Sequence, residues 1–140
     1  MKIQTLGAAL AFALISTGAQ AGGDAEPPPA PGPMALDRDT IVELVSEKTT
    51  ECRKEKDGSL CANYFSEDGV IRRLMYDDGA RKDGRWFVDD QERLCILWDG
   101  KIKPLCFSLY AQDDGSYNLI KKGRHITTIL GTEDGNTKNL

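Results

Sequence analysis

The sequence feature that most constrains the fold is an Asp-Gly dipeptide, which recurs seven times between residues 57 and 135. The copies stand at 57-58, 68-69, 78-79, 83-84, 99-100, 114-115 and 134-135. Asp tolerates the left-handed backbone region and Gly enters it freely, so Asp-Gly between apolar runs is a strong signal for a β-hairpin turn. We therefore expect an antiparallel meander whose consecutive strands are joined by tight turns.

The segments between these turns have the composition of β-strands. We expect strands at 48–53, 60–66, 70–76, 84–88, 93–98, 105–110, 116–121 and 125–131. Alternation assigns to the inner face Leu94, Ile96, Trp98, Leu105, Phe107, Leu109, Trp86, Val88, Val70, Leu74, Tyr76, Ile126, Thr128 and Leu130. About eight short strands with one apolar face must close or stack to bury it. We expect a mainly β fold that closes into a small up-and-down barrel; a two-sheet sandwich is the alternative.

Three segments precede the expected strands. Residues 1–21 have a basic start, a short apolar run and an Ala-Gln-Ala ending, so we expect a secretory signal peptide that is cleaved after Ala21. Residues 22–36 hold five of the six prolines, which predicts a flexible linker. Thr40 and Glu43 have the spacing of a capping box before a helical apolar pattern, which predicts one short helix over 39–47. A single barrel domain would then occupy 37–140, and we expect no segment to span a membrane.

Four cysteines in an exported chain indicate two disulfides, for which three pairings exist. Spacing favours Cys52 with Cys61 and Cys95 with Cys106, because each pair flanks one expected hairpin turn. A zinc site would need closely spaced thiolates, and no C-x-x-C pair occurs, so we expect no metal.

Charge and motifs argue against several functions. The chain has 18 Lys and Arg against 22 Asp and Glu, a net charge of -4, which disfavours nucleic acid as a partner. The single histidine is His125, no serine stands in a G-x-S-x-G elbow, and turn geometry explains most acidic residues. We expect no catalytic residues, no cofactor and no enzymatic activity.

Two sets of residues are candidates for binding. The first is aromatic and would line the barrel interior, unless it is ordinary core: Trp86, Trp98, Phe107 and Tyr117. The second is basic and lies on two neighbouring expected strands: Arg72, Arg73 and Arg85, with Arg81 and Lys82 nearby. These side chains could form one positive stripe that contacts an anionic sugar, a lipid head group or an acidic protein; a charged outer face balanced by acidic turns is the alternative.

Gly84-Arg85-Trp86, with Val88, matches the G-x-W element of lipocalins within a wider pattern. That pattern comprises the apolar positions from Leu36 to Leu44, Tyr64-Phe65-Ser66-x-Asp68-Gly69, Leu94-Cys95-x-x-Trp98, Cys106, Gly115-x-Tyr117 and Asp134-Gly135-Asn136. It covers nearly all of residues 36–136 and resembles small exported proteins of unknown function from Proteobacteria with a lipocalin-like barrel. The resemblance implies an envelope location and a Cys95–Cys106 disulfide, and it supplies no catalytic residues.

These observations lead to two functional hypotheses. The first is an exported, non-enzymatic binding module of the bacterial envelope, monomeric, periplasmic or secreted, that holds a small apolar or amphipathic ligand or an envelope partner. The alternative is an acidic protein inhibitor of a cationic wall-degrading enzyme, which would insert a loop such as Asp89-Asp90 or Asp113-Asp114 into a basic cleft.

Mass spectrometry of the natively purified mature protein tests the processing and the cysteine chemistry together. We expect an N-terminus at Gly22 and a mass lower by four hydrogens than that of the fully reduced chain. A retained residue 1–21 segment, or four free thiols in protein from an oxidising compartment, would contradict this expectation.

Overall fold

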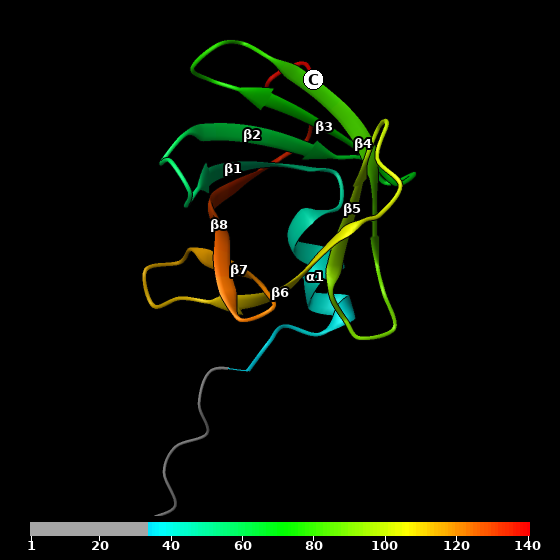
Figure 1. The fold of residues 1–140 in the computed structure, drawn as a ribbon, viewed down its shortest axis with the longest axis vertical. Helices are drawn as coiled ribbons and strands as arrows, with labels where there is room; N and C mark the ends of the chain where they lie inside the picture. The colour runs from blue at the N-terminus through cyan, green and yellow to red at the C-terminus, as the bar shows by residue number, and fades with distance from the viewer. Residues whose placement is uncertain (1–33) are drawn as a thin grey trace, which may run out of the picture. The chain divides into compact units, whose positions relative to one another are not determined.

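The computed structural model describes residues 34–140; the expected signal peptide (1–21) and most of the expected linker (22–36) lie outside the described residues. The elements are α1 (Arg38–Val45), β1 (Lys48–Lys54), β2 (Leu60–Phe65), β3 (Val70–Met75), β4 (Arg81–Val88), β5 (Leu94–Trp98), β6 (Leu105–Ala111), β7 (Tyr117–Lys121) and β8 (Arg124–Asp134). The strands form a closed antiparallel barrel in chain order, in which β8 pairs with β1 (Figure 1). The mainly β fold, the barrel and the single short helix are thus confirmed, and the sandwich alternative is wrong.

Asp-Gly turns join most neighbouring strands. Those at 57-58, 68-69, 78-79, 99-100 and 114-115 lie between consecutive strands, and their glycines all have positive φ. Two copies do not join strands. Asp83-Gly84 lies inside β4, after the β3–β4 turn at 78-79, and Asp134-Gly135 stands at the end of β8, the last strand of the barrel. The expected start of β4 at residue 84 was therefore three residues late.

Helix α1 closes one end of the barrel. The Asp37 carboxylate accepts a hydrogen bond from the Thr40 backbone N–H at 2.9 Å, so Asp37 is the N-cap in place of the expected Thr40. Ile41 and Val45 are fully buried, and Glu47 N donates to Phe65 O at 2.7 Å just beyond the helix. In Figure 1 the helix lies within the ring that the strands outline. It ends at Val45, two residues before the expected end.

The barrel also makes contacts with the last residue of the expected linker. Leu36 N donates to Leu109 O at 2.8 Å, and its side chain packs against the core. The chain is therefore attached to the barrel before the helix begins.

Several expected inner positions lie on the wrong face. In β3 the fully buried residue is Ile71, whereas Val70 and Leu74 are half-buried and Tyr76 is exposed beyond the strand end. In β8 Ile129 joins the core and Ile126 lines the barrel interior as expected, whereas Leu130 is 41% exposed and outside that lining. The β3 sequence Val-Ile-Arg-Arg-Leu-Met is apolar in both phases, and β8 shifts register against both of its neighbours. Leu105 is 38% exposed, but the rest of the expected β5 and β6 set is buried.

Both expected disulfides are present, and each links directly opposed residues on neighbouring strands. Cys52 and Cys61 pair between β1 and β2, and Cys95 and Cys106 pair between β5 and β6. Cys52 lines the barrel interior, while Cys95 alternates with the inward Leu94 and Ile96 and so belongs to the outer face. Each closes a short loop and restricts the unfolded chain, which is worth about 2–3 kcal/mol.

The close approach of β4 to β5 at Gly84 explains why the G-x-W element has a glycine there. Gly84 lies directly opposite Trp98, and a Cβ at this position would lie 2.6 Å from Leu97 O and 3.1 Å from the Trp98 ring. We expect Gly84→Ala to lower the free energy of unfolding by about 1–3 kcal/mol through overpacking. Gly131→Ala in β8 is the matched control, because an added Cβ there would meet no atom of a non-neighbouring residue within 4 Å. Its free energy of unfolding should stay within about 0.5 kcal/mol of the wild-type value. Urea denaturation with intact disulfides measures both; equal effects would refute the close-approach explanation.

Candidate functional site

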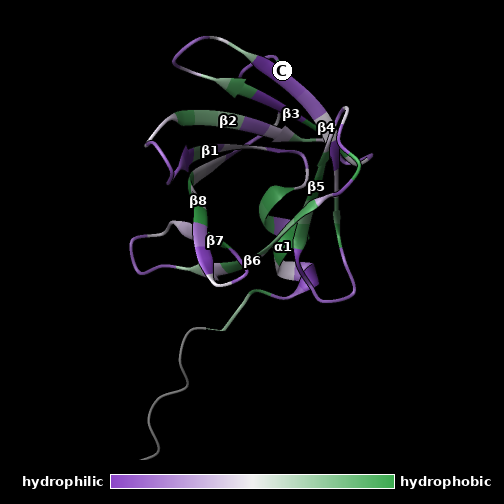
Figure 2. Ribbon diagram, viewed as in Figure 1, coloured by the Kyte–Doolittle hydropathy of each residue, from purple (hydrophilic) through white to green (hydrophobic). Residues whose placement is uncertain are grey.

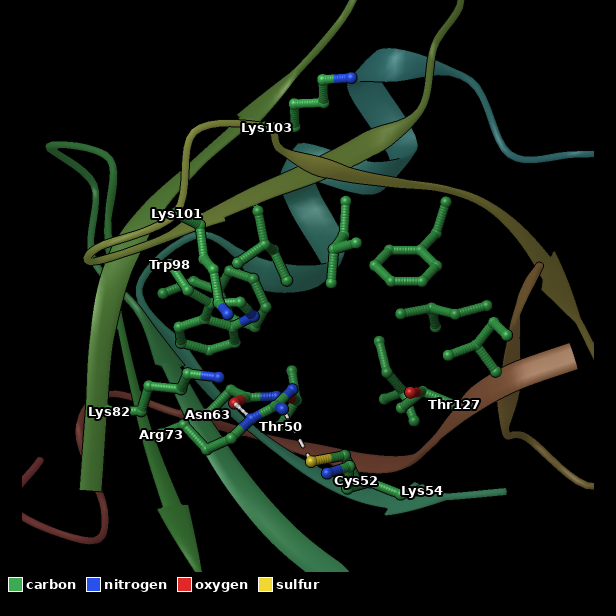
Figure 3. Close-up of a pocket in the computed structure, with 17 residues that line it drawn as sticks. Thr50, Cys52, Lys54, Asn63, Arg73, Lys82, Trp98, Lys101, Lys103 and Thr127 are labelled. Atoms are coloured by element: carbon green, nitrogen blue, oxygen red, sulfur yellow. Dashed lines mark hydrogen bonds between the residues drawn. The ribbon is translucent and has the colours of Figure 1, made fainter. Parts of the chain in front are cut away.

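The barrel contains a cavity of about 450 Å³ near the end opposite α1. Its lining includes the end of β1, the start of β4, the β5–β6 loop and the start of β8, whereas α1 contacts the other ends of β2 and β4. The volume lies within the range of about 300–1,000 Å³ that is usual for small-molecule sites. Figure 3 shows the side chains that surround it.

One wall of the cavity is apolar. It is formed by strands β5 to β8 and consists of Ile96, Leu105, Phe107, Leu119, Ile126 and Ile129, with Thr127 among them. Figure 2 shows the corresponding difference in hydropathy, since β5 is largely green while β4 is purple over much of its length and β3 is purple in part.

The facing wall carries a row of polar side chains across β1 to β4. Thr50 is paired with Asn63, Asn63 with Arg73, and Arg73 with Lys82, so one residue from each strand contributes to the row. All four line the cavity, and in Figure 3 they lie together on the side away from Thr127. We call these four residues the polar row.

Hydrogen bonds hold the centre of the polar row in place. Arg73 Nε donates to Asn63 Oδ1 at 2.8 Å, and Asn63 Nδ2 donates to Cys52 Sγ at 3.4 Å, shown as dashed lines in Figure 3. The Arg73 guanidinium carbon and Lys82 Nζ lie 4.6 and 4.9 Å from the centroid of the Trp98 ring. Such cation–π contacts favour the charged form of both side chains.

The charged residues of the cavity lining are all cationic. Its lining includes five cationic residues and no Asp or Glu: Lys54, Arg73, Lys82, Lys101 and Lys103. None of the five takes part in an ion pair within residues 34–140. Burial lowers the pKa of Arg73 to about 10, so it stays protonated at neutral pH. The Lys82 pKa is also lowered, first by desolvation and then by the nearby cations.

The aromatic candidates divide between the cavity and the closed end. Trp98 and Phe107 line the cavity as expected. Trp86 does not; its Nε1 donates to Ser66 O at 2.8 Å, and its ring packs edge-on against Phe65 with centroids 5.7 Å apart. Tyr117 is half-buried against the core and is also absent from the lining.

The expected positive stripe does not exist as one surface. Arg73 and Lys82 line the cavity, whereas Arg72 and Arg85 are exposed and outside its lining. Successive strand residues point to opposite faces, so the adjacent Arg72 and Arg73 cannot share one. Of the expected Arg72, Arg73 and Arg85 set, only Arg73 therefore lines the cavity, where the exposed Lys82 joins it from β4.

Sequence reasoning missed the polar row because it depends on register. Thr50 and Asn63 carry no motif, and only the pairing of β1 with β2 places them side by side. Lys101 and Lys103 come from the β5–β6 loop; in Figure 3 Lys101 reaches toward Trp98, while Lys103 extends away from it. The one available signal was the basic pair Arg73 and Lys82 on adjacent strands.

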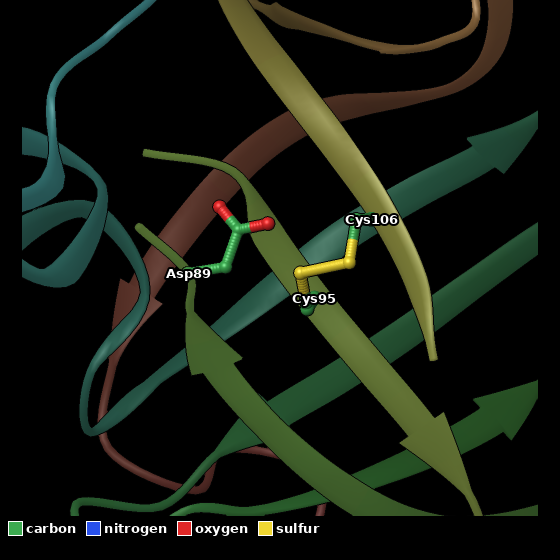
Figure 4. Close-up of side chains that lie close together, drawn as sticks. All are labelled: Asp89, Cys95 and Cys106. Carbon is green, nitrogen blue, oxygen red and sulfur yellow. A yellow bond between two sulfur atoms is a disulfide. The ribbon is translucent and has the colours of Figure 1, made fainter. Parts of the chain in front are cut away.

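A second group resembles a metal site by proximity alone. Potential ligand atoms of Asp89, Cys95 and Cys106 lie within 4.8 Å of one another (Figure 4). The two sulfurs are bonded to each other and carry no thiolate, and the Asp89 carboxylate pairs with the Arg93 guanidinium at 2.7 Å. These atoms lack the free charge that a metal ion needs.

His125 belongs to a small cluster on β8. Its Nε2 lies 2.9 Å from Thr128 Oγ1, and that hydroxyl donates to Glu55 Oε1 at 2.6 Å. The Thr128 hydroxyl is the first cause that lowers the pKa of Glu55, ahead of the contributions of Arg53 and His125. Because the Thr128 proton is directed at Glu55, His125 is not placed to activate that hydroxyl as a nucleophile.

Comparison with known proteins does not assign the chain to a family. No family model matches the chain, and no curated protein or solved structure matches it significantly. Within residues 34–140, no helix has the length and apolar character needed to cross a bilayer.

Fluorescence quenching can measure the positive potential of the cavity. Trp98 lies among the cavity cations, whereas Trp86 is engaged at the closed end, so iodide should quench the protein several-fold more effectively than caesium. Raising the NaCl concentration should shrink that difference. In Trp98→Phe the ratio of iodide to caesium quenching should fall to the ratio measured for free tryptophan; an unchanged, higher ratio there would contradict the assignment to the cavity.

Proposed function

We propose that this protein is an exported, non-enzymatic binding module whose barrel holds a small amphipathic ligand. The observation that carries the proposal is the cavity of about 450 Å³, which has an apolar wall on β5 to β8 and the polar row, beside Phe65 and Cys52, on β1 to β4. Binding sites for small molecules combine a mostly apolar lining with a few placed polar groups.

The proposed location is the periplasm or the exterior of a bacterial cell. Two disulfides are typical of proteins from oxidising compartments. The signal-like residues 1–21 and the resemblance to small exported lipocalin-like proteins of Proteobacteria point the same way. A monomer is part of the proposal, because a closed barrel presents no unpaired strand edge to a second chain.

Blocking the cavity tests the proposal. The neutral fluorescent probe phenylnaphthylamine should bind the mature protein with increased emission, since it would leave water for the apolar wall. Thr127→Phe places a ring in the cavity and should weaken probe binding at least about tenfold, through steric exclusion. Thr132→Phe, at an exposed position of the same strand, is the matched control and should leave binding unchanged.

Two results would overturn the proposal. One is the absence of probe binding to a folded wild-type protein, and the other is equal binding by both variants. Thermal unfolding of each variant establishes that it is folded before its binding is interpreted.

Inhibition of a cationic wall-degrading enzyme is the second candidate. The loops that carry Asp89-Asp90 and Asp113-Asp114 both lie at the barrel end that α1 closes, and Asp90 and Asp113 are exposed. Asp89 and Asp114 are already engaged by Arg93 and Ser116. Salt-sensitive binding to a basic hydrolase would favour this function, and a co-purified amphipathic molecule would favour the first.

A further inference from the structure

We propose that the ligand is an anionic amphiphile of the fatty-acid type, whose carboxylate binds Arg73 and Lys82 and whose apolar chain lies against β5 to β8. This inference rests on the proposed binding function and specifies the chemistry of its ligand.

Among the half-buried arginines of the described chain, Arg73 is the one without an anionic partner. Three arginines there are half-buried: Arg53, Arg73 and Arg93. Arg53 pairs with Glu55 at 3.1 Å and Arg93 with Asp89 at 2.7 Å. No carboxylate of residues 34–140 forms an ion pair with Arg73, although removal of a cation from water is unfavourable unless it is paired. An anion from outside the chain would supply the missing partner.

The geometry prepares the guanidinium of Arg73 for such an anion. Its Nε donates to Asn63 Oδ1, and Asn63 is itself tied to the Cys52–Cys61 disulfide through Cys52 Sγ. This leaves the two Nη groups without an acceptor among the described residues, beside the cavity. Arginine binds carboxylates through paired, charge-assisted hydrogen bonds, and a guanidinium that is already oriented loses less freedom on binding.

A second polar group of the same row also lacks a partner. Thr50 is fully buried, and its Oγ1 is the one buried side-chain oxygen or nitrogen without a hydrogen bond in residues 34–140. Unsatisfied buried hydroxyls are uncommon because each loses its hydrogen bonds to water. Thr50 lines the cavity opposite Asn63, so a polar ligand atom could satisfy it.

The remaining cations favour entry of an anion. Lys82 is exposed at the start of β4, and Lys54 and Lys101 add two further positive charges to the lining; Lys103 also lines the cavity, but its side chain extends away from Trp98 (Figure 3). In a protein with a net charge of -4, this is a local reversal of sign. Clefts lined by one sign of charge raise the local concentration of the opposite ion. The apolar wall facing them disfavours small hydrated anions and favours an anion that carries a chain.

Isothermal titration calorimetry of the mature, disulfide-bonded protein tests the head group. Three probes share one chain length and differ in charge: decanoate, decanol and decyltrimethylammonium. We expect decanoate to bind about ten- to a hundredfold more tightly than decanol, as charge-assisted hydrogen bonds would provide, and the cation to bind most weakly. Acetate should not compete with decanoate, because it lacks the apolar chain.

Variants assign the effect to the interior cations. Arg73→Met keeps much of the side-chain volume and should reduce decanoate affinity about ten- to a hundredfold while leaving decanol affinity unchanged. Lys82→Met, at an exposed position that should not disturb folding, should give a smaller loss of decanoate affinity alone. Arg72→Met is the matched control, because Arg72 is the outward neighbour of Arg73, and should change neither affinity.

The outcomes separate this inference from the proposed function. Equal binding of decanoate and decanol, or unchanged selectivity in both Arg73→Met and Lys82→Met, would overturn the proposal that the ligand has an anionic head group. The proposed function as a binding module would remain. If acetate competed as strongly as decanoate, the proposal that the ligand binds through an apolar chain would be overturned. Binding of phenylnaphthylamine without decanoate binding would also reject the head group, and failure of every probe would reject the proposed function as well.

Discussion

The pairing of β8 with β1 is the interaction on which the rest of the structure depends. It joins the two ends of the strand sequence, so every strand has two hydrogen-bonded neighbours and one side of each must face inward. Closure also determines which residues meet across the interior. The polar row of β1 to β4 and the apolar wall of β5 to β8 face one another only because the sheet curves until its first and last strands touch.

The interior is divided along the barrel axis as well as across it. At one end α1 inserts Ile41 and Val45, and Trp86 packs against Phe65, which leaves that end filled. At the other end the side chains are long and cationic and enclose free volume. Close packing therefore contributes less to stability at the end that holds the cavity. There the Cys52–Cys61 disulfide links β1 to β2, the strand pair that carries Thr50 and Asn63.

Much of the fold could be predicted from local chemistry. Asp-Gly turns, strand composition and cysteine spacing located the hairpins and both disulfides because each depends on a few neighbouring residues. Prediction failed where two phases were equally apolar, as in β3, or where a bulge shifted the register, as in β8. It also failed at Asp83-Gly84, where the glycine serves a close approach to Trp98 across the sheet and makes no turn. Of the candidate binding residues, Trp98, Phe107 and Arg73 line the cavity, while Trp86, Tyr117, Arg72 and Arg85 do not.

The sequence by itself determined the class of fold, because turns and strand alternation are encoded by residues a few positions apart and need no distant partner. It also favoured the correct one of the three possible cysteine pairings, since each pair flanks a single turn. Only the tertiary structure decided that Arg73 turns inward while Arg72 does not, and that Thr50, Asn63, Arg73 and Lys82 form one row. The reason is physical: a shift of one residue in register moves every side chain of a strand to the opposite face, and register is set by closure of the whole barrel.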